Sequence, residues 1–298
     1  DPEVPEGTEY YLPAGSSYRV TPFALMKGFR LAGSRDGVKP IVVLEGSWSI
    51  AEGSYLSSLE FDNIEFRHEA NNNYFMNTSK AYTIENVSFV NCDFISLRRG
   101  FWRHQSANAK YIMNLEMEGC RFEGCGWQTS AYGAFNLQSF DKDNGVSYDQ
   151  VDRAIFRNCT FSNDNDGTNG YGWGNLFYAP YMDKPIDLEY KNVTIYNYSR
   201  NQRLINIESA VGSKLVMEGI LLASPCGDLF AIGANTTTTF SNNYTTADYT
   251  LGGKNMNATD LKITAVELFA DPANGDLTIK DTSSPIVSNR AGDTRWLP

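Results

Sequence analysis

The chain has 298 residues, with 35 acidic and 25 basic side chains and a formal charge of −10. Nucleic acids and anionic membrane surfaces are also negative, so this acidic excess argues against both as partners. No stretch is long and apolar enough to span a bilayer, and no basic-then-apolar signal peptide stands at the start. The five cysteines include no C-x-x-C pair, so neither a zinc site nor a disulfide framework is indicated.

A short phrase, apolar-x-apolar-polar-(Asn or Gly)-apolar-x-apolar, recurs six times between residues 59 and 222. Asn and Gly adopt positive φ most readily, so each copy is predicted to bend at its central residue. The apolar alternation slips by one position there, which predicts two short strands that meet at a corner rather than a helix. The predicted corners are Asn63, Asn86, Gly119, Asn158, Asn192 and Gly219.

The same alternation predicts two rows of inward side chains, stacked from one copy to the next. The first row is Ile64, Val87, Cys120, Cys159, Val193 and Ile220. The second row is Phe66, Phe89, Phe122, Phe161, Ile195 and Leu222. Cys120 and Cys159 therefore read as small core hydrophobes.

A third strand is predicted after each corner, centred on Phe75, Phe101, Phe135, Phe177, Ile205 and Phe230. The residues after these, Met76, Trp102, Asn136, Tyr178, Asn206 and Ala231, are the outward candidates. The corner spacings of 23, 33, 39, 34 and 27 residues suit a coil of three short strands with unequal loops. A leucine-rich repeat and a propeller are the competing folds, but their helix phrase and Trp-Asp signature are missing.

Weaker copies at residues 29–33 and 240–242 extend the pattern at both ends. We therefore predict an all-β parallel solenoid of about eight coils in one domain, residues 1–298. Residues 1–28 are expected to cap its N-terminal edge, 29–254 to form the coils, and 255–298 to cap its C-terminal edge.

Function in such a fold is expected on one outward sheet face and its loops, because the inward residues are committed to packing. The longest loops flank the middle coils and would wall a groove along the third strands. Flat aromatic rings there could stack on sugars while polar side chains take the hydroxyls; the alternative is that the aromatics anchor loops. The predicted substrate-binding residues are Trp102, Arg103, Trp127, Asn136, Gln138, Trp173, Tyr178 and Asn206.

Charged residues near this groove could provide more specific ligand contacts. Arg98 and Arg99 could pair with uronate carboxylates, or be solvated. The segments 141–145 and 164–167 suggest Ca²⁺, but both lack the closing Glu of a calcium loop, so turns rich in Asx residues are favoured and no cofactor is predicted.

Catalytic candidates are few. His104 follows Arg103 in the groove, and Glu208 is the one outward carboxylate assigned to a third strand, whereas glycoside hydrolysis needs two carboxylates. We assign no catalytic residue.

Three-strand coils with an Asn corner resemble the right-handed, single-stranded parallel β-helix of the pectin-lyase-like superfamily. The end of the chain, with ELFADPANGDLTI at 267–279, Ser-Pro at 284–285 and AGDTRW at 291–296, is similar to the closing segment of β-helical domains in Bacteroidetes surface lipoproteins. That resemblance implies an exported protein at the outer membrane or cell surface, working with other glycan-utilisation proteins. It also implies a preceding immunoglobulin-like domain. The opening residues 1–6, DPEVPE, are typical of a linker, so we expect residue 1 to follow a processing or truncation point.

The calcium-aspartate cluster of pectate lyases and the Gly-His-Gly set of polygalacturonases do not occur in the third strands. The expected function is therefore binding of an extended polysaccharide, of the pectin type, without catalysis. A polysaccharide lyase or glycoside hydrolase is the first alternative, and a structural or adhesive spacer is the second.

Overall fold

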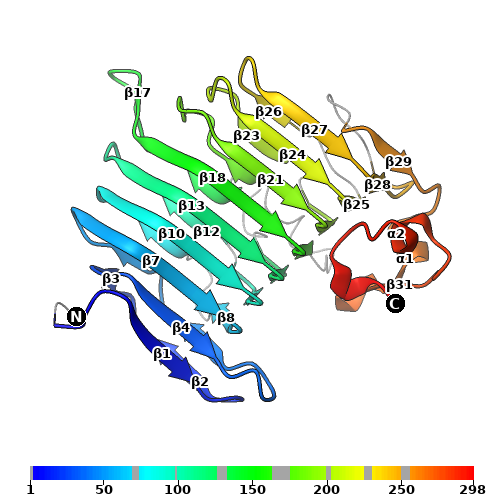
Figure 1. Cartoon of the computed structure of the whole chain (residues 1–298), viewed down its shortest axis with the longest axis horizontal. Helices are drawn as coiled ribbons and strands as arrows, with labels where there is room; N and C mark the ends of the chain where they lie inside the picture. The colour runs from blue at the N-terminus through cyan, green and yellow to red at the C-terminus, as the bar shows by residue number, and fades with distance from the viewer. Residues whose placement is uncertain are drawn as a thin grey trace.

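The computed structural model describes residues 3–68, 74–97, 99–125, 133–162, 175–198, 203–224, 230–249 and 256–298. These residues form mainly β-strands, gathered in three long sheets whose neighbouring strands are all parallel (Figure 1). The chain passes through the first, second and third sheets in turn and then returns to the first, and one such passage is called a coil here. The predicted all-β class is confirmed, and the arrangement is consistent with a parallel β-solenoid.

Each sheet takes its strands from successive coils. Among the described residues, the first sheet contains β1 (Thr8–Leu12), β4 (Phe29–Gly33), β7 (Ser54–Asp62), β10 (Tyr82–Val90), β13 (Lys110–Glu118), β18 (Asp149–Arg157), β21 (Asp187–Lys191), β24 (Lys214–Glu218) and β27 (Thr237–Ser241). The second contains β2 (Ser17–Val20), β5 (Ile41–Leu44), β8 (Glu65–His68), β11 (Asp93–Ile95), β14 (Arg121–Glu123), β19 (Thr160–Ser162), β22 (Thr194–Tyr196), β25 (Leu221–Ala223), β28 (Asn243–Thr245) and β29 (Ala258–Asp260). The third contains β9 (Tyr74–Thr78), β12 (Gly100–His104), β15 (Gly133–Leu137), β20 (Asn175–Tyr178), β23 (Ile205–Ile207) and β26 (Phe230–Ile232).

Smaller elements complete the chain. β3 (Ala24–Leu25) pairs in parallel with β6 (Ser49–Ile50). Two antiparallel pairs are β16 (Phe140–Asp141) with β17 (Val146–Ser147), and β30 (Phe269–Asp271) with β31 (Asp276–Ile279). The helical elements are α1 (Ala265–Leu268), α2 (Pro285–Ser288) and the 3₁₀ turns η1 (Pro272–Asn274) and η2 (Thr294–Trp296).

Aromatic side chains stack inside the solenoid at the spacing of the strands. In the second sheet Phe66, Phe94, Phe122 and Phe161 are successive register partners. Their ring centroids lie 5.4, 4.7 and 4.8 Å apart, close to the roughly 4.8 Å between hydrogen-bonded strands. The row continues through Ile195 and Leu222, as predicted for its later members.

The second copy of the repeat was placed five residues too early. The structure puts Phe94, not Phe89, in the row with Phe66, while Phe89 stacks on Phe61 in the first sheet at 4.8 Å. Val87 likewise belongs to the first sheet, where it pairs with Leu59 and Leu115. The error arises because residues 82–89 and 87–94 both fit the apolar pattern, and the first fit lies within the long strand β10.

The same shift corrects one corner. Asn91 has φ of 52°, whereas Asn86 lies within β10 and is not among the residues with positive φ. The other five predicted corners are confirmed, with φ between 49° and 66°. The Asn91 side chain donates from Nδ2 to Oδ1 of Asn63 at 2.6 Å, so asparagines of neighbouring coils are linked at this corner.

The third sheet also departs from the prediction in its first two strands. Met76 and Trp102 are register partners of each other, and Trp102 is the partner of Phe135, which faces the core. Met76 and Trp102 therefore point inward, and the outward residues of those strands are Asn77 and Arg103. Phe75 and Phe101, the second residues of β9 and β12, are also buried in the core, so two consecutive apolar residues of each strand point the same way.

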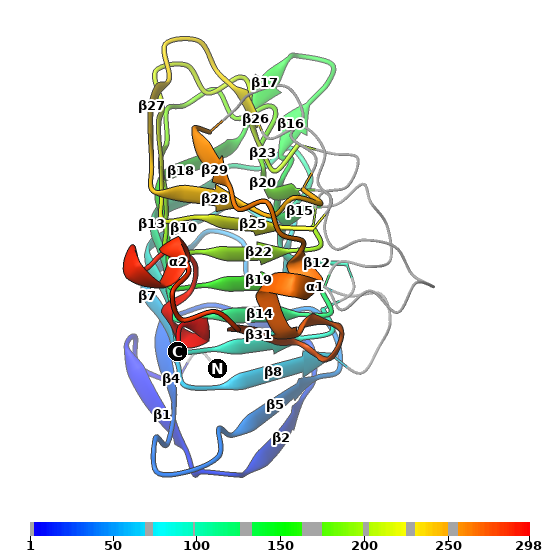
Figure 2. The same cartoon turned by 90° about the vertical axis from the view of Figure 1, so that its right-hand side faces the viewer.

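The segments at both ends of the chain pair with or pack against the long sheets. At the N-terminus β1 and β2 extend the first and second sheets as their outermost strands. At the C-terminus β29 pairs with β28, and Met256 is buried in the core. Residues 265–298 then fold back over the outer face of the second sheet, where Figure 2 shows α1, α2 and β31 in front of its strands.

Candidate ligand-binding face

A polar row runs along the outer face of the third sheet. Register partners across five coils are Asn77, Arg103, Asn136, Tyr178 and Asn206. Neighbouring strands lie about 4.8 Å apart, so the row forms a line of hydrogen-bonding groups along the axis of the solenoid. Four predicted binding residues, Arg103, Asn136, Tyr178 and Asn206, are thereby brought together.

The centre of this row has an unsatisfied acceptor. Asn136 is 1% exposed, and its Oδ1 atom has no hydrogen-bond partner. Next to it, the side chain of Gln138 is hydrogen-bonded to the Tyr178 hydroxyl, whose pKa is raised, mainly by burial. A buried carbonyl oxygen without a partner costs about 1 to 3 kcal/mol.

An aromatic pair lies beside the polar row and was not among the predicted binding residues. Phe140 and Tyr181 follow two neighbouring strands of the third sheet, and their rings stack at 4.3 Å with an interplanar angle of 15°. Tyr181 is 37% exposed, and its hydroxyl is near enough to influence that of Tyr178. The pair offers an apolar surface next to hydrogen-bonding groups. In the sequence, Phe140 comes four residues after Asn136, and Tyr181 comes three residues after Tyr178.

A half-exposed ion pair flanks β23, the next strand of the third sheet. Arg203 Nη1 lies 3.2 Å from Glu208 Oε2, and the Asn206 side-chain oxygen accepts from the Glu208 amide at 3.3 Å. Both charges also act on the Tyr178 hydroxyl. Glu208 is the carboxylate that the sequence placed on this face, so the face carries Asn, Gln, Tyr, Arg and Glu side chains within three coils.

At the other end of the row two arginines lie over one aromatic ring. The guanidinium carbons of Arg103 and Arg99 are 5.3 and 5.9 Å from the centroid of Tyr74. These distances are those of cation–π contacts. Arg98, Trp127 and Trp173 lie outside the described residues.

Trp102 and His104 do not contribute to this face. Both are fully buried in the interior, contrary to the prediction that they line the groove. Trp102 Nε1 donates to the Tyr82 hydroxyl at 3.3 Å, and that hydroxyl lies 2.5 Å from His104 Nε2. On the other side of the ring, His104 Nδ1 is 2.6 Å from Asp149 Oδ1.

This buried network extends through Ser139 to a lysine, Lys110. Asp149 Oδ2 accepts from the backbone amide of Ser139 at 2.5 Å, and the Ser139 hydroxyl accepts from Lys110 Nζ at 2.7 Å. Tyr82, Lys110 and Asp149 are the first residues of three neighbouring strands and are register partners. The interior corner between the third and first sheets is therefore polar, which the spacing of these residues in the sequence did not reveal.

Burial lowers the pKa of two basic side chains in this network. It lowers the pKa of His104, although the Asp149 carboxylate acts in the opposite direction. It also lowers the pKa of Lys110 to about 8. A neutral His104 that donates from Nδ1 to Asp149 and accepts at Nε2 from Tyr82 satisfies all three side chains.

We expect the stability of the protein to fall as the pH drops below about 6.5, because burial lowers the pKa of folded His104, so the unfolded chain binds a proton at this residue more readily than the folded chain does. The free energy of unfolding should lose up to about 1.4 kcal/mol per pH unit from this residue. Urea unfolding between pH 7.5 and 5.5 measures it. The His104→Gln variant should lack this component, whereas His68→Gln, at the other histidine, should keep it. Equal slopes in the wild type and His104→Gln would contradict the assignment.

Of the two suggested calcium segments, only one is described. Asp141 Oδ1 accepts from the amides of Asp143 and Asn144 at 2.9 and 3.2 Å, which makes the segment an Asx turn. The segment 164–167 lies outside the described residues. Within the part of the chain that the structure describes, no three His, Cys, Asp or Glu side chains are grouped as metal ligands.

No protein-family model matches the sequence, and a search of curated proteins gives no significant match. None of the helices in the described ranges has the length and apolar character needed to cross a membrane.

Proposed function

We propose that this protein binds an extended polysaccharide on the outer face of its third sheet, without cleaving it. The observation that carries the proposal is the exposed Phe140–Tyr181 stack beside a row of amide, phenol and charged side chains. Sugar rings present apolar C–H faces and polar edges, which this combination matches. The row runs along successive coils, as an extended polymer requires.

The finer features of the resemblance belong to the same proposal. We take the solenoid to be a right-handed, single-stranded β-helix of about eight coils, similar to the pectin-lyase-like superfamily. The protein would be exported and held at the outer membrane or cell surface with other glycan-utilisation proteins. A pectin-type ligand is supported by Arg103 and Arg203 on the binding face, because guanidinium groups pair well with uronate carboxylates.

The Tyr181→Ala variant should bind the polysaccharide more weakly, by about 2 kcal/mol or roughly 30-fold, because it removes the exposed half of the aromatic stack. Affinity electrophoresis on pectic and hemicellulosic glycans, followed by calorimetry on the best ligand, measures the change. The matched control is Tyr55→Ala, which removes a tyrosine that is 57% exposed on the first sheet and should leave binding unchanged.

Three results would redirect the proposal. Binding that survives Tyr181→Ala and is lost in Tyr55→Ala would place the ligand on the first sheet. New reducing ends or unsaturated products formed by the wild type would make the protein an enzyme, and failure to bind any glycan would favour a structural or adhesive spacer.

A further inference from the structure

The buried polar network at the corner between the third and first sheets extends to the residue next to the aromatic stack. Ser139 immediately precedes Phe140 and is 0% exposed. Its amide donates to Asp149 Oδ2 at 2.5 Å, its hydroxyl accepts from Lys110 Nζ at 2.7 Å, and its carbonyl accepts from the Tyr148 amide at 2.8 Å. The amide, hydroxyl and carbonyl of Ser139 all have partners, so the backbone that leads into Phe140 is fixed.

The hairpin that carries Phe140 is anchored at its base. Phe140 pairs with Ser147, and Figure 1 shows the hairpin, at the label β17, projecting from its coil. The Lys110 amide donates to the Tyr148 carbonyl at 2.9 Å, so the hairpin joins the interior through Ser139 and Tyr148. The position of the Phe140 ring therefore depends on buried groups that lie out of reach of a ligand.

Lys110 holds two segments at once. It is 0% exposed, and besides Ser139 its ammonium group donates to the carbonyls of Ser106 and Asn108 at 3.2 and 2.7 Å. An ammonium group has three N–H donors, and three acceptors surround this one. The lysine thereby connects the loop before β13 to the base of the hairpin.

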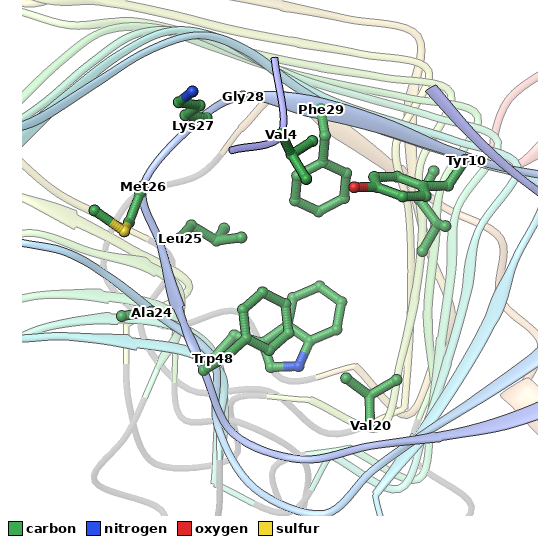
Figure 3. Close-up of a pocket in the computed structure, with 12 residues that line it drawn as sticks. Val4, Tyr10, Val20, Ala24, Leu25, Met26, Lys27, Gly28, Phe29 and Trp48 are labelled. Carbon is green, nitrogen blue, oxygen red and sulfur yellow. The ribbon is translucent and has the colours of Figure 1, made fainter. Parts of the chain in front are cut away.

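A coil of this solenoid can be closed without such a network. The interior of the first coil is lined by aliphatic and aromatic side chains, including Leu25, Phe29 and Trp48 (Figure 3). Burying charged side chains often costs more than packing apolar side chains of similar volume. What a fully hydrogen-bonded buried network supplies instead is a single, rigid arrangement of the segments that it joins. The segment joined here is the hairpin that carries Phe140.

The segment that carries the second ring is also hydrogen-bonded to the body of the solenoid. Tyr181 follows Pro180, whose carbonyl accepts from the Ser209 hydroxyl at 2.6 Å. The rings of Phe140 and Tyr181 lie 4.3 Å apart at an interplanar angle of 15°. Both rings must therefore be placed accurately, since a small displacement of either segment would separate them.

We propose that Ser139 and Lys110 are positioning residues of the polysaccharide-binding face, which hold the Phe140 ring against Tyr181 without contacting the ligand. Their effect on affinity rests on the proposed function, whereas their effect on the ring does not. A ring that is already in place loses little conformational freedom when a sugar binds, and a loosened ring must first be ordered. Loss of the bond between Ser139 and Lys110 should weaken binding although no group that touches the polymer is removed.

One fluorine label reports on the ring independently of binding. para-Fluorophenylalanine at position 140 alone gives a single fluorine NMR signal, whose chemical shift depends on the neighbouring Tyr181 ring. The Tyr181→Ala variant supplies the signal of the unstacked ring. In Ser139→Ala, which removes the acceptor of Lys110, the signal should move towards that reference. Calorimetry should show about fivefold weaker polysaccharide binding, as expected when one more side chain is ordered on binding.

Two further variants complete the experiment. Lys110→Met keeps the aliphatic stem and removes the donor, so it should have the same two effects as Ser139→Ala; thermal unfolding shows which variants are folded. Ser213→Ala is the matched control, because Ser213 is 1% exposed at the same corner of a later coil. Its hydroxyl donates to the Ala210 carbonyl at 2.8 Å and accepts from the Ile186 amide at 3.1 Å. Ser213→Ala should lower thermal stability and leave the fluorine signal and the affinity unchanged.

The proposal is overturned if folded Ser139→Ala keeps the wild-type fluorine signal, or if its signal moves while its affinity stays the same. Equal changes in Ser213→Ala would also refute it, because they would show a general effect of lost stability. A wild type that binds no glycan, together with a moved signal in Ser139→Ala, would contradict the polysaccharide function and support the positioning of the ring.

Discussion

Replacing Trp102 with alanine should lower the free energy of unfolding by about 3 to 5 kcal/mol, the usual cost of truncating a buried tryptophan. Trp102 is 0% exposed and lies in the main core, between register partners Met76 and Phe135. The variant also removes the N–H donor to the Tyr82 hydroxyl. Urea unfolding followed by circular dichroism measures the change.

The neighbouring residue supplies the control. Arg103 is on the same strand but on the outer face, so Arg103→Ala should change stability by less than about 1 kcal/mol. Trp102→Phe should lie between the two, because it keeps a ring but leaves Tyr82 without its donor. If Trp102→Ala were as stable as Arg103→Ala, the inward register of β12 would be wrong.

The orientation of the residues in β12 could be predicted only in part from the sequence. Within a strand, side chains alternate between faces, and that rule places Asn136, Tyr178 and Asn206 correctly. It fails in β12, where the neighbours Phe101 and Trp102 are both buried in the core. Two consecutive apolar residues of one strand can therefore both face inward, which alternation alone does not predict.

The corners were easier to predict because positive φ restricts the residue type. Asn63, Gly119, Asn158, Asn192 and Gly219 were identified from that preference together with the repeated apolar phrase around each of them. Asn86 was a false match, since asparagine also serves inside a strand: its Nδ2 donates to the Ser57 carbonyl at 3.3 Å on the sheet surface. Residue preference indicates that a bend is possible, whereas stacking in three dimensions decides which candidate bends.

The parts of the site that the sequence did not reveal depend on contacts between coils. His104 and Asp149 are 45 residues apart, and loop lengths vary too much to predict that they meet. Phe140 and Tyr181 also come from neighbouring coils, so their stack follows from the register of the third sheet. The face of the solenoid against which residues 265–298 pack likewise depends on tertiary contacts with residues far away in the sequence.

Deleting residues 265–298 should have the largest effect on solubility and stability. Their apolar side chains form a second buried cluster with Leu221, Ala223 and Tyr244 on the outer face of the second sheet. Burying one large apolar side chain is worth about 1.5 to 3 kcal/mol, and the deletion would expose several at once on a flat sheet face. We expect a chain ending at Thr264 to aggregate, or to unfold at least about 5 kcal/mol more easily.

Polar contacts hold the same segment in register. Trp296 Nε1 donates to Thr160 Oγ1 at 2.7 Å, and that hydroxyl donates to Asp293 Oδ2 at 2.7 Å. The amide of Asp293 donates to Thr194 Oγ1 at 2.9 Å, so the segment is bonded to β19 and β22 of the second sheet. These bonds span more than one coil, which means the segment also ties neighbouring coils together.

Point variants on α1 test the docking without removing the chain. Leu268 is 1% exposed within the second cluster, whereas Val266, two residues earlier, is 64% exposed. Leu268→Ala should cost about 2 to 5 kcal/mol and Val266→Ala less than about 0.5 kcal/mol. Thermal unfolding and light scattering of both variants and the deletion measure the effect. A soluble deletion variant with wild-type stability would mean that the second sheet tolerates an exposed apolar face, and that residues 265–298 are an accessory to the solenoid rather than part of its stability.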